Sequence, residues 1–149
     1  MDLSLDSRVW VYQSDRCFDD SEIETINLLC HDFIKGWAAH GAPLKASFEV
    51  IDKYFLVLAV DQNIASASGC SIDSSVKFIK DLELKFKINF FNRMNLVVKK
   101  DKEVKLISFT ELQSYSDWKV YNPLVDSLEL LRSSFLIPVT ESDFYKMQA

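Results

Sequence analysis

The residues best suited to chemistry lie in a short polar stretch, residues 65–75, between an apolar segment and a predicted helix. Cys70 comes just before that helix, where backbone N–H groups and the helix dipole stabilise a thiolate. His40 is in a predicted loop, so it is the better of the two histidines to act as a base, and Asp73 or Ser71 could orient it. This combination indicates a thiol-dependent enzyme with Cys70 as nucleophile, His40 as base and Asp73 in support.

The same residues also have a purely structural interpretation. Cys70 would then be a small buried side chain, Asp73 would be the N-cap of the helix, and His40 would bond the carbonyls that end the preceding helix. The charge of Asp73 also opposes ionisation of a neighbouring thiol. We therefore favour a non-enzymatic binding domain, for a protein or small ligand and without a cofactor, over the enzyme.

A ligand is expected at the start of the same helix, because helix N-termini bind anions. The predicted ligand-binding residues are Gly41, Gly69, Ser71, Ser74, Ser75 and Arg93. No metal site is predicted, since Asp15, Asp19 and Asp20 are typical of loop acids and helix caps. The three cysteines have no CxxC spacing, which favours free thiols over a disulfide framework or zinc site.

Length and composition indicate a single globular domain over residues 1–149, with 48% hydrophobic and 26% charged residues. The net charge of -5 disfavours a nucleic-acid partner, because such domains are usually basic. No apolar run is long enough for membrane insertion, and the acidic start lacks the features of a signal peptide. We expect a cytoplasmic protein, as a monomer or a homodimer.

The apolar patterns predict an α+β fold. Strands are expected at residues 9–12, 46–50, 54–60, 94–98, 104–109 and 135–137, the 54–60 strand being central and the last an edge strand. Helices are expected at about 22–39, 74–86, 110–117 and 122–133, with a last turn near 140–143. Ser21 and Glu24 match a capping box for the first helix, and Thr110 is the expected cap of the third.

This order of elements predicts a ferredoxin-like βαββαβ core with a C-terminal strand and helical extension. A profilin-like or longin-like arrangement of sheet and helices is the alternative. In the ferredoxin-like arrangement, the end of the first helix and the start of the second lie at the same end of the sheet. His40, Gly41 and residues 69–71 would therefore be neighbours in space.

Residues 37–48, 68–75 and 88–93, above all the Gly-Cys-Ser-Ile-Asp run at 69–73, resemble an uncharacterised family of small bacterial proteins. The resemblance covers most of the chain. Members often carry the label "ABC transporter ATPase", but no catalytic residue is implied by the family. An ATPase of that class needs a GxxxxGK[ST] loop to hold the phosphates. With glycines only at 36, 41 and 69, this chain has no such loop, so we expect no ATPase activity.

Overall fold

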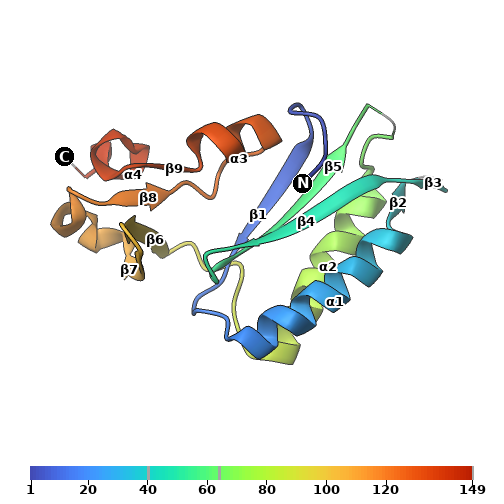
Figure 1. Ribbon diagram of the computed structural model, residues 1–149, viewed down its shortest axis with the longest axis horizontal. Helices are drawn as coiled ribbons and strands as arrows, with labels where there is room; N and C mark the ends of the chain where they lie inside the picture. Colours follow the sequence, from blue (N-terminus) through green and yellow to red (C-terminus); the bar gives the residue numbers. More distant parts are fainter. Residues whose placement is uncertain (40, 64, 149) are drawn as a thin grey trace.

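A three-stranded antiparallel sheet and two long helices form the first half of the computed structural model, which describes residues 1–39, 41–63 and 65–148. The strands are β1 (Arg8–Gln13), β4 (Lys45–Ile51) and β5 (Phe55–Asp61), in the order β1-β5-β4. The helices α1 (Asp20–Gly36) and α2 (Gly69–Phe86) lie side by side against this sheet (Figure 1). A small hairpin of β2 (Ala38–Ala39) and β3 (Ala42–Pro43) follows α1.

The central strand β5 is buried along its whole length, as its apolar sequence predicts. Leu56 and Leu58 pack with Ile26 of α1 and Ile79 of α2 on one face of the sheet. Side chains alternate along a strand, so Phe55, Val57 and Ala59 contribute to a second core on the opposite face. Both faces of β5 are therefore covered, which explains why it carries no polar side chain before Asp61.

The second half of the chain forms a separate four-stranded antiparallel sheet in the order β7-β6-β8-β9. Its strands are β6 (Asn95–Lys100), β7 (Glu103–Ser108), β8 (Lys119–Tyr121) and β9 (Leu136–Pro138). Four short helical segments accompany it: η1 (Phe109–Tyr115), α3 (Leu128–Ser134), η2 (Val139–Glu141) and α4 (Asp143–Lys146). No helix in the described ranges combines the length and apolarity needed to cross a membrane.

Aromatic packing and a polar network connect the two larger sheets. Phe55 lies 4.9 Å from Tyr121 and 5.0 Å from Phe135, measured between ring centroids. At the β4–β5 turn, Asp52 accepts a hydrogen bond from the Tyr121 hydroxyl and pairs with Lys99 at 2.9 Å. Burial alone would raise the pKa of Asp52, but these two hydrogen bonds outweigh it and lower that pKa. The charged form of Asp52 thus helps to hold the second sheet against the first.

The structure confirms the α+β class, and β1, β4 and β5 have the order and directions expected of the first three strands in a ferredoxin-like sheet. The fourth strand of that arrangement would pair with the outer edge of β1. Instead, the strand after α2, β6, pairs with β7 and β8 in the other sheet. The ferredoxin-like topology is therefore not confirmed, and β1 retains an outer edge that no strand covers in the described chain.

Several predicted helix boundaries were wrong, and a local contact explains each. The capping box of α1 is formed by Asp19 and Glu22, not by Ser21 and Glu24. Arg16 donates two hydrogen bonds to Glu22, at 2.8 and 2.7 Å, and these hold the pKa of Glu22 at about 2. The helix ends at Gly36 rather than residue 39, because the following residues enter the β2–β3 hairpin.

The boundaries of the two later helices also differ from those predicted. The helix expected at 122–133 is α3, which begins only at Leu128, because Leu128 donates its N–H to the Ser7 carbonyl at 2.9 Å. The helix expected at 110–117 is the 3-10 segment η1, capped by Ser108 rather than Thr110. The predicted edge strand near the C-terminus is confirmed, since in the described part of the chain β9 pairs with β8 alone.

Candidate functional site

Ser68, not Asp73, is the N-cap of α2. The helix begins at Gly69, not near residue 74, and the Ser68 hydroxyl accepts a hydrogen bond from the Ser71 N–H at 3.2 Å. The Ser71 hydroxyl lies 2.7 Å from the Ser68 N–H, which completes a capping box. Asp73 is exposed and lies beyond the first turn. The prediction that Asp73 caps this helix is therefore wrong, because Ser68 occupies the N-cap position and its hydroxyl accepts the Ser71 N–H.

Replacing Ser68 with alanine should lower the free energy of unfolding by about 0.5–2 kcal/mol, the usual effect of losing an N-cap. Asp73→Ala is the matched control, and its effect should stay within about 0.5 kcal/mol. Urea denaturation of the two variants measures the difference. A larger loss for Asp73→Ala than for Ser68→Ala would contradict this assignment.

Cys70 is exposed in the first turn of α2, so the interpretation of Cys70 as a buried packing residue is wrong. Gly69 precedes it, and a Cβ at that position would meet nothing within 4 Å. His40 lies outside the described residues, so no distance joins it to Cys70. Among the described residues, no group of acids, histidines or cysteines has a geometry suited to a metal ion.

Thiol labelling should separate the cysteines into two classes. Cys17 and Cys70 are exposed, whereas Cys30 is buried and desolvation raises the pKa of its thiol to about 12. With Ellman's reagent at pH 8, we expect two of the three thiols of the native protein to react rapidly and the third to react only in denaturant. Cys70→Ser should reduce the rapid class to one thiol, and Cys30→Ser should leave it at two. Three rapid thiols in the native chain would contradict the burial of Cys30.

The serine hydroxyls predicted to bind a ligand at the start of α2 form hydrogen bonds within the first turns of the helix. Ser71 and Ser75 are buried, and the Ser75 hydroxyl donates to the Ile72 carbonyl at 2.6 Å. The Ser74 hydroxyl donates to the Cys70 carbonyl at 3.0 Å. These bonds cap and stabilise the first turns, so the hydroxyl groups are not arranged around a ligand.

The end of α1 and the start of α2 do lie together, as predicted. The Trp37 indole N–H donates to the Ser71 carbonyl at 2.8 Å, and β2 contacts α2. Gly41, in the β2–β3 connection, has a φ of 80°, which suits glycine. Arg93, however, follows the other end of α2, a helix of 18 residues and thus about 27 Å long (Figure 1). The structure therefore separates Arg93 from the other predicted ligand residues.

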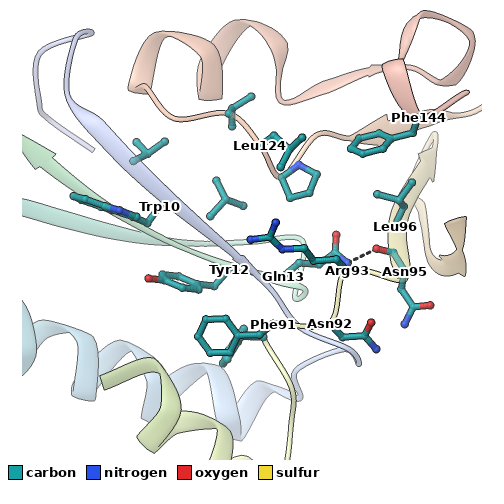
Figure 2. Close-up of a pocket in the computed structure, with 15 residues that line it drawn as sticks. Trp10, Tyr12, Gln13, Phe91, Asn92, Arg93, Asn95, Leu96, Leu124 and Phe144 are labelled. Carbon is teal, nitrogen blue, oxygen red and sulfur yellow. Dashed lines mark hydrogen bonds between the residues drawn. The ribbon is translucent and has the colours of Figure 1, made fainter. Parts of the chain in front are cut away.

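Arg93 instead lines a pocket of about 490 Å³ along the outer edge of β1. Segments far apart in the sequence form its walls: β1 itself, residues 90–96 with Phe91, Arg93 and the start of β6, residues 123–125 before α3, and Phe144 of α4. Figure 2 shows Arg93 beside Gln13 in the middle of the pocket, with Phe91 on one side and Leu124 on the other. A volume of this size is typical of small-ligand sites.

Two polar groups of this pocket, Gln13 Oε1 and the Arg93 guanidinium, have no partner among the described residues. Gln13 is 7% exposed, and its side-chain N–H donates to the Asn95 carbonyl at 2.9 Å, while its Oε1 has no hydrogen-bond partner among the described residues. Arg93 is exposed and forms no hydrogen bond or ion pair with another side chain in the described ranges. Among the described residues that line the pocket, Arg93 is the one that carries a charge. An unpaired buried acceptor and a free cation are groups that a ligand can satisfy.

Apart from Arg93, the pocket residues were not predicted. Their sequence signals are those of ordinary core and loop residues, and the walls come together only through the tertiary fold. Gln13 directly follows the strand predicted at residues 9–12, where a polar residue is ordinary, so the sequence contains no signal for its role. Comparisons with protein-family models, curated proteins and solved structures found no match for this chain.

Proposed function

We propose that this chain is a binding domain, and that its ligand occupies the pocket between the outer edge of β1 and the second sheet. The observation that carries this proposal is the set of unsatisfied polar groups within mostly apolar walls, namely Gln13 Oε1 and the Arg93 guanidinium. Apolar walls supply affinity through burial, and a few fixed polar groups supply orientation. The site proposed from the sequence, near His40 and residues 69–75, is replaced by this one.

The pocket occupies the place that a ferredoxin-like fold gives to its fourth strand. That strand would lie along β1, and here β6 leaves this edge to join another sheet. We also propose a ferredoxin-like arrangement for the first half, with a profilin-like or longin-like arrangement as the alternative. A relationship to the small bacterial family, a cytoplasmic location and a monomeric or homodimeric state belong to the same proposal.

The thiol-dependent enzyme remains the second candidate, because the exposure of Cys70 allows contact with a substrate. It has less support, since the hydroxyls around Cys70 bond within the helix. Rapid alkylation of Cys70 by iodoacetamide near pH 6, lost in both Cys70→Ser and His40→Ala, would favour the enzyme over the binding domain.

Titration with anilinonaphthalene sulfonate, an apolar aromatic anion, tests the proposed pocket. We expect saturable binding to the native protein, with amide chemical-shift changes at Val11, Gln13 and Leu124. Arg93→Gln should weaken binding by about tenfold, since it removes a charge-assisted contact. Lys80→Gln is the matched control for charge, because Lys80 is exposed on α2 outside the pocket.

Leucine variants give a second matched pair. Leu124→Ser removes an apolar wall and should weaken binding of the dye, whereas Leu84→Ser, at an exposed position of α2, should not. Absence of saturable binding, or equal losses in the pocket and control variants, would overturn the proposal.

A further inference from the structure

We propose that the ligand is an extended peptide segment of another protein, which adds as a strand to the outer edge of β1 and presents an acidic side chain to Arg93. This inference rests on the proposed function, because it assigns a ligand class to the same pocket. Three independent features support it: the unpaired main-chain groups of β1, the shape of the opening, and the charge within it.

The hydrogen bonds at the ends of β1 show which of its main-chain groups face the pocket. Ser14 continues the ladder with β5 by donating its N–H to the Tyr54 carbonyl at 2.7 Å. Bonded and non-bonded pairs alternate in an antiparallel ladder, so Trp10 and Tyr12 also bond to β5. Val9, Val11 and Gln13 must then direct their N–H and C=O groups to the outer edge.

Both ends of this outer edge are already paired, and its middle is open. The Val9 N–H donates to the Asp126 carbonyl at 3.0 Å, and the Asp15 N–H donates to the Asn89 carbonyl at 3.1 Å. Between these bonds, neither Val11 nor the main chain of Gln13 has a partner on this side within the described ranges. Such a row of donors and acceptors is a template for one more strand.

The length of the opening favours a short peptide over another folded sheet. Residues 9 to 15 of an extended strand span about 20 Å, at roughly 3.3 Å per residue. A second copy of this chain would offer its own β1, closed at both ends by the same contacts. Two such edges would have to displace the bonds at Val9 and Asp15 in both copies before they could pair. A single extended segment fits between those bonds without displacing them.

The walls suit the alternating side chains of a strand. Tyr12 and Phe91 lie on one side of the edge, with ring centroids 6.0 Å apart, and Leu124 and Leu96 lie on the other. Successive residues of an added strand would point to these two sides in turn. Both walls are apolar, so apolar residues are expected on both sides of the bound segment.

The charge of Arg93 and the free acceptor of Gln13 indicate which polar groups the ligand should carry. No acidic residue is among the described residues that line the pocket with Arg93, so a carboxylate placed there meets a cation without a competing anion. The net charge of -5 acts at longer range, where salt screens it beyond about 10 Å. Gln13 Oε1 is buried and accepts no hydrogen bond in the described structure, so a peptide N–H that reaches it would satisfy its missing bond.

Selection from a library of random eight-residue peptides, displayed as internal segments, tests the proposal on the full chain. We expect enrichment of sequences that combine alternating apolar residues with one Asp or Glu. The best sequence is then synthesised with acetylated and amidated ends, so that its carboxylate comes only from a side chain. Arg93→Gln should weaken its binding by about tenfold, Arg93→Lys should restore part of the loss, and Lys80→Gln should have no effect.

Two measurements separate strand addition from other ways of binding a peptide. N-methylation at alternate residues of the peptide should weaken binding by roughly two- to tenfold for each lost hydrogen bond, and the intervening residues should tolerate it. In the protein, hydrogen exchange of the Val11 amide should slow on binding. The Trp10 and Tyr12 amides, already bonded to β5, should exchange slowly with or without peptide.

Failure of this inference is distinguishable from failure of the proposed function. If no peptide is enriched, or if N-methylation is tolerated at every position, strand addition is overturned. The pocket is then still supported as a small-ligand site if the aromatic sulfonate binds and Arg93→Gln weakens the binding of the sulfonate. If the sulfonate also fails to bind the pocket, both proposals fall. Peptide binding that is unchanged in Arg93→Gln would overturn the acidic specificity.

Discussion

Replacing Phe55 with alanine should lower the free energy of unfolding by about 3–5 kcal/mol, the range found when a buried phenylalanine is truncated. Phe55 is fully buried and belongs to the core that β1 and β5 share with β8 and α3. Its ring packs on the rings of Tyr121 and Phe135, whose centroids are 4.6 Å apart. Truncation would leave a cavity between the two larger sheets, where the rigid strands on both sides limit collapse.

Equilibrium denaturation in urea, followed by circular dichroism, measures this loss. Leu84→Ala is the control, because Leu84 is 81% exposed on α2 and its truncation should change stability by no more than about 0.5 kcal/mol. A loss below about 1 kcal/mol for Phe55→Ala would show that the Phe55 side chain is not packed as described.

Replacing Trp37 with alanine should also cost about 3–5 kcal/mol. Trp37 is 3% exposed and lies between the end of α1 and the first turn of α2. Its ring centroid is 5.1 Å from that of Phe33 and 5.8 Å from that of Trp10, and its indole N–H donates to the Ser71 carbonyl. The alanine variant loses the packed surface and the hydrogen bond together.

Trp37→Phe separates these two contributions. It keeps much of the aromatic packing but cannot donate to Ser71, so we expect a smaller loss, to which the hydrogen bond contributes about 0.5–1.5 kcal/mol. Urea denaturation with fluorescence detection measures all three proteins, since two other tryptophans remain as probes. Equal stability of Trp37→Ala and the unchanged chain would contradict the burial of Trp37.

Strong local patterns made part of the fold predictable. The apolar run in β5 predicts a strand covered on both faces, and the structure agrees. Cap positions were less predictable, because both Ser21–Glu24 and Asp19–Glu22 match the capping-box pattern. Arg16 decides between them by pairing with Glu22 and donating to the Phe86 carbonyl, a contact between residues far apart in the chain.

The candidate site could not be predicted as a whole, for a related reason. Its main-chain groups are open only because β6 pairs in the other sheet, and residues 95–100 contain no local signal for that choice. The sequence indicates Arg93 as a possible ligand residue for the start of α2, whereas the structure places Arg93 beyond the other end of that helix. Side chains such as Gln13 and Leu124 become part of a site only when segments far apart in the sequence meet in the folded chain.

The burial of β5 also determines how this protein should respond to heat. The six residues from Phe55 to Val60 are all apolar, with no proline, glycine or charge, a composition typical of segments that form intermolecular cross-β structure. In the native protein β1 and β4 pair with both edges of this segment. Thermal unfolding exposes this whole β5 segment to other chains. We therefore expect thermal unfolding to be irreversible, with an apparent melting temperature that depends on protein concentration and scan rate. The lifetime of the protein at elevated temperature would then depend on the rate at which β5 becomes exposed.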